Sequence, residues 1–286
     1  MKKIFYSIVF LWLCIFKNVP ALSKNSSSYY ILIDKTTNLL KVMDQEKIVT
    51  TFEIGWGLKS ELPKQKKGDF LTPEGVYEIL NWRTSSQYLY FVELNYPNLN
   101  DLAWAYYQGL LTTYQFEKFS NLFSQKRRVL SPLGTEIGIH GGGAFKEEKK
   151  KGRTYKNYNW TKGCIALSNE DLLKLLNLIS FNQKVFILNS SKSLYGILEK
   201  LVYPKEVKPL EFFEGEVSFK IDNSTYYKFI LKKYFRGLKY LTFQEWKENK
   251  LVKELNSKAD GTFGASEEEF LKNLVISKIY LMETQK

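Results

Sequence analysis

Three short runs with β-strand character follow one another near the start of the chain, and they constrain the fold more than any other feature. The runs are YYILID (29–34), LLKVMD (39–44) and IVTTFEIG (48–55), and polar segments such as KTTN and QEK separate them. Apolar runs of this length between polar turns are typical of antiparallel strands that are neighbours in sequence. The chain is therefore expected to begin with a β-meander.

The middle of the chain continues this pattern and adds helices. Strands are expected in GDFLTPEGVYEIL (68–80), YLYFVELNY (88–96), TEIGIH (135–140), GCIALS (163–168) and VFIL (185–188). Helical spacing of apolar residues predicts two helical pieces within 101–123, separated near Gly109. Ser168 and Asp171 resemble a capping box, which predicts a leucine-rich helix directly after the fourth of these strands.

The pattern changes near residue 190. Helices are expected in SLYGILEKLVY, TYYKFILKKYF, TFQEWKENKLVKEL and EEFLKNLVISKIYLM, and a strand in EVSFKID. The sequence thus predicts a mixed α+β protein with a mainly-β domain over 24–189 and a smaller mixed α/β unit over 190–286.

Residues 1–23 have the composition of a secretory signal peptide. Two lysines precede an apolar run over 4–16, and small residues follow at Ala21 and Ser23. A retained membrane anchor is the alternative, although the run is shorter than the roughly 20 residues that a span needs. We expect the protein to be exported to the periplasm or cell-wall space, with Cys164 as its single remaining cysteine.

The chain is basic, with a formal net charge of +12 concentrated at 59–67 and 146–156. Such an excess usually suggests nucleic acid as the partner. Export argues against nucleic acid, so attraction to an anionic polymer of the cell envelope is one interpretation. A solvated, soluble surface is the other.

Two scarce residues, His140 and Cys164, each lie beside glycine. His140 is the only histidine, so a zinc site of about four ligands is not expected, and no CxxC or GxSxG motif is present. A cysteine attacks as the thiolate, and a nearby histidine can take its proton and return it to a leaving amine. An inert buried thiol is the alternative. Papain-like and NlpC/P60 peptidases have the reverse order, with cysteine first.

The segments TEIGIHGGG and WTKGCIALSNEDL resemble the catalytic motif of the YkuD-type L,D-transpeptidases, which reads roughly H-G, a variable stretch, then S/T-x-G-C-I/V-R. The segments ILID, GDFLTPEGVYEI and LNYPN are similar to other segments of that family and occur in the same order. The resemblance covers 29–189. It implies a β-sandwich with flanking helices for the catalytic domain.

The resemblance also implies the roles of individual residues. Cys164 would be the nucleophile and His140 the general base and acid, with the carbonyl of Gly141 orienting the imidazole. The N–H groups of Gly163 and Cys164 would bind the oxyanion. Four further residues are expected to contact substrate: Trp160, Thr161, Lys162 and Gly142. No metal or other cofactor is implied.

The implied substrate is the peptide stem of peptidoglycan. The thiolate would attack the carbonyl of the third residue, D-alanine would leave, and a neighbouring amine would resolve the thioester to a 3-3 cross-link. An L,D-carboxypeptidase, which uses water instead, and a non-catalytic wall-binding scaffold are the alternatives. The 190–286 unit is expected to present substrate or dock an envelope protein.

The sequence departs from the family pattern at two places. Ala166 stands where most members have arginine, and the stretch from His140 to Cys164 is unusually long and basic. The long stretch suggests an altered lid over the cleft.

Overall fold

The computed structural model describes residues 29–60, 62–125, 127, 129–204, 212–234 and 237–282. The expected signal peptide at 1–23 lies outside these residues. Within the described ranges, no helix has the length and apolar character needed to cross a membrane.

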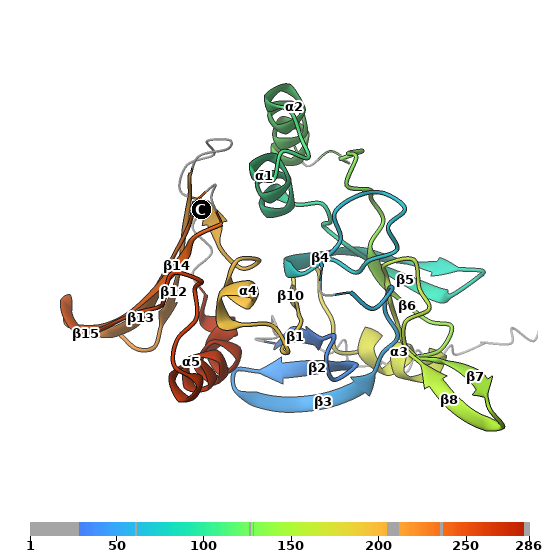
Figure 1. Ribbon diagram of the computed structural model, residues 1–286. Helices are drawn as coiled ribbons and strands as arrows, with labels where there is room; N and C mark the ends of the chain where they lie inside the picture. Colours follow the sequence, from blue (N-terminus) through green and yellow to red (C-terminus); the bar gives the residue numbers. More distant parts are fainter. Residues whose placement is uncertain are drawn as a thin grey trace, which may run out of the picture.

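A mixed sheet of eight strands forms the first part of the molecule (Figure 1), in the order β3-β2-β1-β10-β4-β5-β6-β9. The strands are β1 (Tyr29–Asp34), β2 (Leu39–Asp44), β3 (Lys47–Glu53), β4 (Gly75–Ser85), β5 (Leu89–Leu94), β6 (Gly138–His140), β9 (Ile165–Ala166) and β10 (Lys184–Leu188). The strands β1, β2 and β3 pair antiparallel in sequence order, so the predicted meander is confirmed.

The two edges of this sheet meet. Directly after the edge strand β3, Gly55 forms an antiparallel bridge with Ala166 on the other edge strand, β9. The N–H of Gly55 donates to the carbonyl of Ala166 at 2.8 Å, and the N–H of Ala166 donates back at 2.7 Å. The sheet is therefore rolled around one apolar core, consistent with the expected sandwich arrangement.

Helices cover this core. The expected helical pair is present as α1 (Leu99–Tyr107) and α2 (Thr113–Ser124), with Gly109 at φ +72° in the turn between them. The helix α3 (Asn169–Leu176) follows β9 and buries Leu172 and Leu175, and the Ser168 hydroxyl accepts from the N–H of Asp171 at 3.0 Å. The predicted start of this helix is therefore confirmed, and it fixes the end of β9.

The C-terminal part is a second, antiparallel sheet. Its strands are β11 (Tyr203–Pro204), β12 (Phe212–Lys220), β13 (Thr225–Tyr234), β14 (Lys239–Lys247) and β15 (Lys250–Asn256), in that order. The accompanying helices are α4 (Leu194–Leu198), α5 (Ala265–Lys278) and the short 3-10 helix η1 (Ile279–Leu281).

Two of the expected helices are wrong, because TYYKFILKKYF and TFQEWKENKLVKEL form strands β13, β14 and β15. In β13, Phe229 and Leu231 are buried while Lys228, Ile230 and Lys232 are not, which is the two-residue period of a strand. Between β14 and β15, Glu248 and Asn249 both have positive φ, as a two-residue hairpin turn requires.

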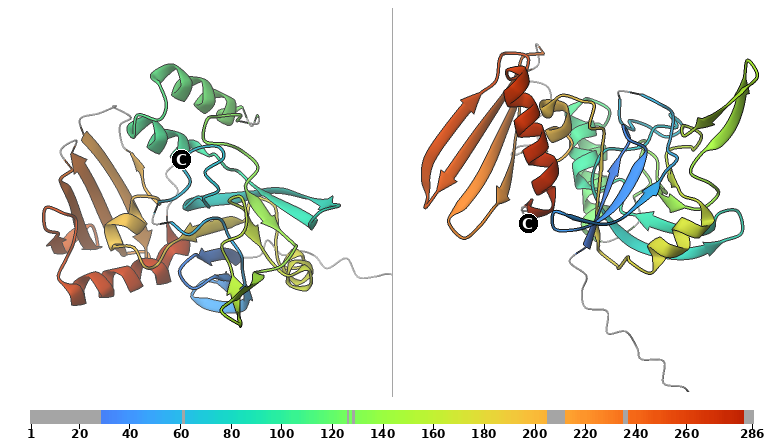
Figure 2. Two further views of the ribbon diagram at one scale, coloured as in Figure 1. Left: turned by 45° about the vertical axis from the view of Figure 1, so that its right-hand side comes forward. Right: turned by 90° about the horizontal axis from the view of Figure 1, so that it is seen from below.

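The second sheet and its helices pack against strands β1 and β10 of the first sheet. The helix α5 lies along one face of the second sheet (Figure 2), and the same apolar cluster includes Tyr30 and Leu32 of β1 and Phe186 and Leu188 of β10. The residues before and after the predicted domain boundary at 189/190 therefore share one apolar core. The boundary itself stays a prediction.

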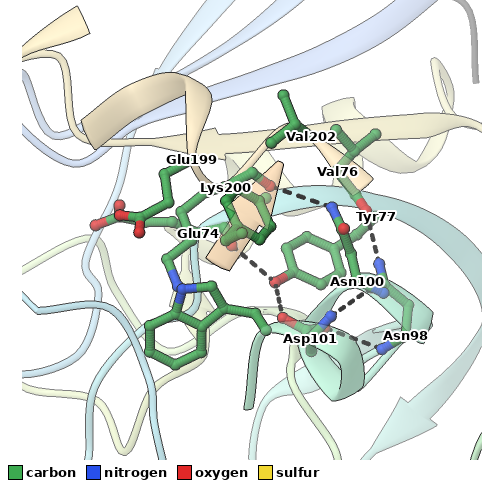
Figure 3. Close-up of a pocket in the computed structure, with 12 residues that line it drawn as sticks. Glu74, Val76, Tyr77, Asn98, Asn100, Asp101, Glu199, Lys200 and Val202 are labelled. Carbon is green, nitrogen blue, oxygen red and sulfur yellow. Dashed lines mark hydrogen bonds between the residues drawn. The ribbon is translucent and has the colours of Figure 1, made fainter. Parts of the chain in front are cut away.

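A buried polar cluster lies beside this shared core (Figure 3). The Glu74 carboxylate pairs with Lys35 at 2.6 Å and with Lys192 at 2.7 Å, and the Tyr77 hydroxyl donates to Asp101 at 2.9 Å. The enclosed cavity measures only ≈ 20 Å³, about the space of one water molecule. This cluster therefore holds the parts of the fold together and has no room for a substrate.

Candidate active site

The predicted catalytic pair lies at two neighbouring strands, since His140 ends β6 and Cys164 directly precedes β9. The strands β6 and β9 pair in parallel, with His140 opposite Ala166. Side chains alternate along an extended chain, so continuing β9 back to Cys164, two residues before Ala166, would place its side chain on the face of the sheet that carries His140. The strands predicted at 135–140 and 163–168 are present as β6 and β9, and they are neighbours in the sheet.

The imidazole of His140 is buried and held in one tautomer. Its Nδ1 lies 2.6 Å from the carbonyl oxygen of Gly141. A carbonyl can only accept, so Nδ1 carries the proton and Nε2 is left with its lone pair. Burial lowers the pKa of His140, and the nearby Lys146 lowers it further, against the opposing effect of the Gly141 hydrogen bond. The resting imidazole is therefore a neutral base.

Aromatic rings fix the orientation of this imidazole. The ring of Tyr88 lies 4.2 Å from that of His140, centroid to centroid, and the ring of Trp160 lies 6.2 Å away at 78°. The carbonyl of Tyr88 also accepts from the N–H of Gly141 at 3.0 Å. Tyr88 was not singled out in the sequence, because an aromatic residue beside a strand has no distinguishing pattern.

Only glycine fits at position 141. A Cβ there would come within 2.3 Å of Asn169 Oδ1 and 2.6 Å of the Tyr88 carbonyl. Asn169 Oδ1 also accepts from the N–H of Gly142 at 3.0 Å. Asn169, the first residue of α3, thus holds the turn after His140, and its place next to the predicted helix cap is the only sequence signal for this role.

The thiol of Cys164 is neutral at rest. Its Sγ donates a weak hydrogen bond to the carbonyl of Glu136 at 3.5 Å. Burial raises the pKa of Cys164 to about 11, a hydrogen bond from the Gly138 backbone and the charge of Lys64 oppose the rise, and Glu136 adds to it. A neutral thiol beside a neutral imidazole means that the proton must move during attack rather than before it.

Lys64 is a second residue that the sequence analysis did not assign. Its ammonium is buried, pairs with Asp69 at 2.7 Å and donates to the carbonyl of Lys66 at 3.0 Å. Asp69 belongs to the GDFLTPEGVYEI segment. This segment therefore places a buried cation near the nucleophile.

The loop before Cys164 is braced by Thr161. The buried hydroxyl of Thr161 donates to the Cys164 carbonyl at 2.6 Å and accepts from the N–H of Gly163 at 3.2 Å. Gly163 has φ +113°, and a Cβ there would meet the Leu71 carbonyl at 2.7 Å. In this conformation the N–H of Gly163 is engaged by Thr161, so oxyanion binding by that group and substrate contact by Thr161 stay predictions.

The other expected substrate residues lie around the same turn. Trp160 is half-buried beside His140, Gly142 is half-buried with φ +103°, and Lys162 is exposed. Their contacts with substrate stay predictions. In the described part of the chain, no three His, Cys, Asp or Glu side chains gather where they could hold a metal ion.

The long basic stretch forms a hairpin of β7 (Lys146–Lys150) and β8 (Arg153–Asn157). Its side chains are mostly exposed and it projects from the body (Figure 2), and its expected role as a lid over the cleft stays a prediction. At its base, Lys156 pairs with Glu53 at 2.9 Å, and the Tyr158 hydroxyl donates to the same carboxylate. The base of the hairpin contacts the turn after His140, because Lys146 Nζ donates to the carbonyl of Gly142.

The chain is similar to solved structures of L,D-transpeptidases from Stackebrandtia nassauensis (14% identity, 56% of this chain and 55% of that chain, TM-score 0.33) and Mycobacterium smegmatis (12%, 56% and 58%, 0.32). It is also similar to the catalytic domain of the E. faecium enzyme (14%, 57% and 98%, 0.33). The chain therefore spans little more than half of the first two structures.

No curated protein matches the chain. The family model of the L,D-transpeptidase catalytic domain, YkuD, matches residues 28–187, which include every predicted site residue and more than half of the chain. The chain therefore belongs to the YkuD family of L,D-transpeptidase catalytic domains.

Proposed function

We propose that this protein is an exported L,D-transpeptidase that acts on the peptide stems of peptidoglycan. The observation that carries the proposal is that His140 ends β6 and Cys164 directly precedes its parallel neighbour β9, with Nε2 of His140 left as a base by the Gly141 carbonyl. Membership in the family supplies the substrate class, and the composition of residues 1–23 supports export.

In the first step, Sγ of Cys164 attacks the carbonyl carbon of the third stem residue while Nε2 of His140 takes the thiol proton. The C–N bond to the terminal D-alanine then breaks, and the imidazolium returns that proton to the leaving nitrogen. A thioester remains on Cys164. General acid–base assistance of this kind typically contributes a factor of about 10² to 10⁴.

In the second step, an amine from a neighbouring stem attacks the thioester, and His140 takes its proton. The new amide is a 3-3 cross-link, and Cys164 is regenerated as the neutral thiol. The same imidazole serves both half-reactions, because the acceptor amine enters where the leaving amine departed.

Incubation of the protein with disaccharide-tetrapeptide, followed by mass spectrometry of the products, tests the proposal. We expect loss of alanine together with cross-linked dimers, and no product from Cys164→Ala. Thr161→Ser, which keeps the buried hydroxyl beside the nucleophile, serves as the matched control for an intact loop. Turnover by Cys164→Ala would refute covalent catalysis.

A second candidate is an L,D-carboxypeptidase on the same fold. It is favoured by the exposed β7–β8 hairpin, which projects from the body (Figure 2), because a hairpin that does not close over the thioester would not exclude water from it. Hydrolysis and transfer share every step up to the thioester, and they differ only in whether water is excluded. Release of alanine without any dimer, with acceptor present, would select this candidate over the transpeptidase.

The basic surface supports action on a polymer that carries many carboxylates. The formal charge of +12 would raise the local concentration of the protein at such a polymer, and this attraction would weaken with salt.

We also propose that the 190–286 unit docks an envelope protein. Pull-down of the full chain from envelope extracts at low and high salt tests it.

A further inference from the structure

We propose that Lys146 recognises the carboxylate of the amino acid that leaves, and so makes the enzyme selective for stems that end in a free carboxylate. The proposal rests on the proposed function, because it assigns a specificity role within the same site. It concerns a residue at the base of the hairpin, outside the H-G and G-C motifs.

The ammonium of Lys146 lies against the turn that follows His140. Its Nζ donates to the carbonyl oxygen of Gly142 at 2.9 Å and lies 4.1 Å from the centroid of the Trp160 ring. That ring is itself 6.2 Å from the His140 ring. An ammonium has three N–H donors, so the Gly142 bond leaves two that can reach an anion.

Chemistry places the leaving carboxylate on this side of the site. His140 must deliver a proton to the leaving nitrogen, so that nitrogen lies next to the imidazole. In an α-amino acid, the carboxylate is attached to the carbon that bears this nitrogen. The carboxylate therefore lies within a few ångströms of the nitrogen that faces Nε2, and we assign it to the flexible Lys146 side chain, whose ammonium is held at the turn that follows His140.

Strand β9, which pairs with the strand of His140, has no cationic side chain that could bind the leaving carboxylate. Ala166, opposite His140, is fully buried, and its backbone is paired with Gly55 on one side and β6 on the other. Lys64, on the side of Cys164, is already paired with Asp69. The hairpin therefore brings a cation to the leaving-group side that the strand does not provide.

The contact with Lys146 does not change which bonds form and break in this step. The S–C bond forms, the C–N bond breaks, and the thiol proton passes through His140 to the nitrogen. Lys146 neither gains nor loses a proton. It binds a charge that is present in the ground state and in the transition state alike, so its removal should raise KM more than it lowers kcat.

The test compares two stem tetrapeptides, one ending in D-alanine with a free carboxylate and one ending in D-alanine amide. For the full-length protein we expect kcat/KM to favour the carboxylate by roughly tenfold, which suits a charge-assisted hydrogen bond at an exposed site. Lys146→Gln should lose this preference, chiefly through KM, while any change in kcat that follows from the pKa of His140 should be the same for both substrates. Lys146→Arg should keep the preference.

Lys149→Gln is the matched control. Lys149 lies on the same strand, is exposed, and its loss changes the net charge equally. It should retain the preference. If Lys146→Gln also retains it, or loses activity equally on both substrates, Lys146 only braces the turn and the proposal is wrong. Failure of the unaltered protein to release alanine or its amide from either substrate would instead overturn the proposed function, and this proposal with it.

Discussion

The protonation state of Cys164 leads to the sharpest prediction. Burial raises the pKa of the thiol to about 11, from an ordinary value of 9.0. At pH 7 the thiolate fraction is then roughly 10⁻⁴ instead of 10⁻², about a hundredfold less. A thiolate of higher pKa is intrinsically more nucleophilic, by roughly eightfold for this difference. The net expectation is alkylation roughly tenfold slower than that of an ordinary thiol.

The assay is pulse alkylation with iodoacetamide between about pH 7 and pH 10, read at the peptide that contains Cys164. The rate should rise about tenfold per pH unit without a plateau in this range. The same protein unfolded in urea is the control, and its rate should level off near the ordinary pKa of a thiol. His140→Ala should leave the alkylation profile almost unchanged, because the imidazole is neutral in the resting enzyme.

A plateau below about pH 8 would refute this reasoning, since it would mean that a thiolate–imidazolium pair exists before substrate binds. A large drop in alkylation by His140→Ala at neutral pH would point the same way. Turnover, by contrast, should fall about 10² to 10⁴-fold in His140→Ala under either resting state. The alkylation profile therefore separates the two resting states, and turnover alone does not.

Three further changes test the surroundings of the site. Thr161→Val leaves the N–H of Gly163 without its hydroxyl partner, so the free energy of unfolding in urea should fall by about 1–3 kcal/mol, whereas Thr161→Ser should be close to unchanged. Gly141→Ala forces Asn169 away from a Cβ that would come within 2.3 Å, and turnover should fall about tenfold or more while Cys164 alkylation is retained. Burial raises the pKa of Asp101 from 3.8 to about 6, so its contribution to stability is present below pH 3.8 and is lost as pH rises through 6. Relative to the unaltered protein, Asp101→Asn should therefore be more stable at pH 7 than at about pH 4, by about 3 kcal/mol in urea titrations.

The sequence predicted the centre of the site because the chemistry demands scarce residue types. A chain with one histidine offers one candidate for an imidazole base. The glycine beside that histidine, and the cysteine directly after Gly163, favour a cysteine nucleophile as its partner. The role of Gly141 came only from the resemblance, since a backbone carbonyl leaves no trace in side-chain chemistry. The structure brings that carbonyl to Nδ1 of His140.

The residues around this centre could not be found in the same way. Tyr88, Asn169 and Lys64 are common residue types, and they reach the site from a strand end, a helix start and a loop. Their roles depend on how the sheet rolls up. The Gly55–Ala166 bridge that closes the sheet has no sequence pattern that would reveal it.

The errors in the C-terminal part have a different cause. TYYKFILKKYF contains apolar residues at both two-residue and four-residue spacing, so the helical and strand patterns compete. Its aromatic and β-branched residues favour a strand, and the neighbouring strands β12 and β14 supply the pairing that decides the outcome. Pairing of this kind is a tertiary effect, so the spacing of residues within one segment cannot predict it.

The segment 69–75 links the second sheet to the nucleophile. At one end, the Leu71 carbonyl lies against Gly163, and Thr72 Oγ1 accepts from the N–H of Gly57 at 2.9 Å. At the other end, Glu74 is held by two buried ion pairs, one of them to Lys192, which follows the mainly-β domain. Removing one partner of a buried pair typically costs about 3–5 kcal/mol. The part of the chain after residue 190 therefore helps to hold the backbone against which the nucleophile loop packs, whatever else it binds.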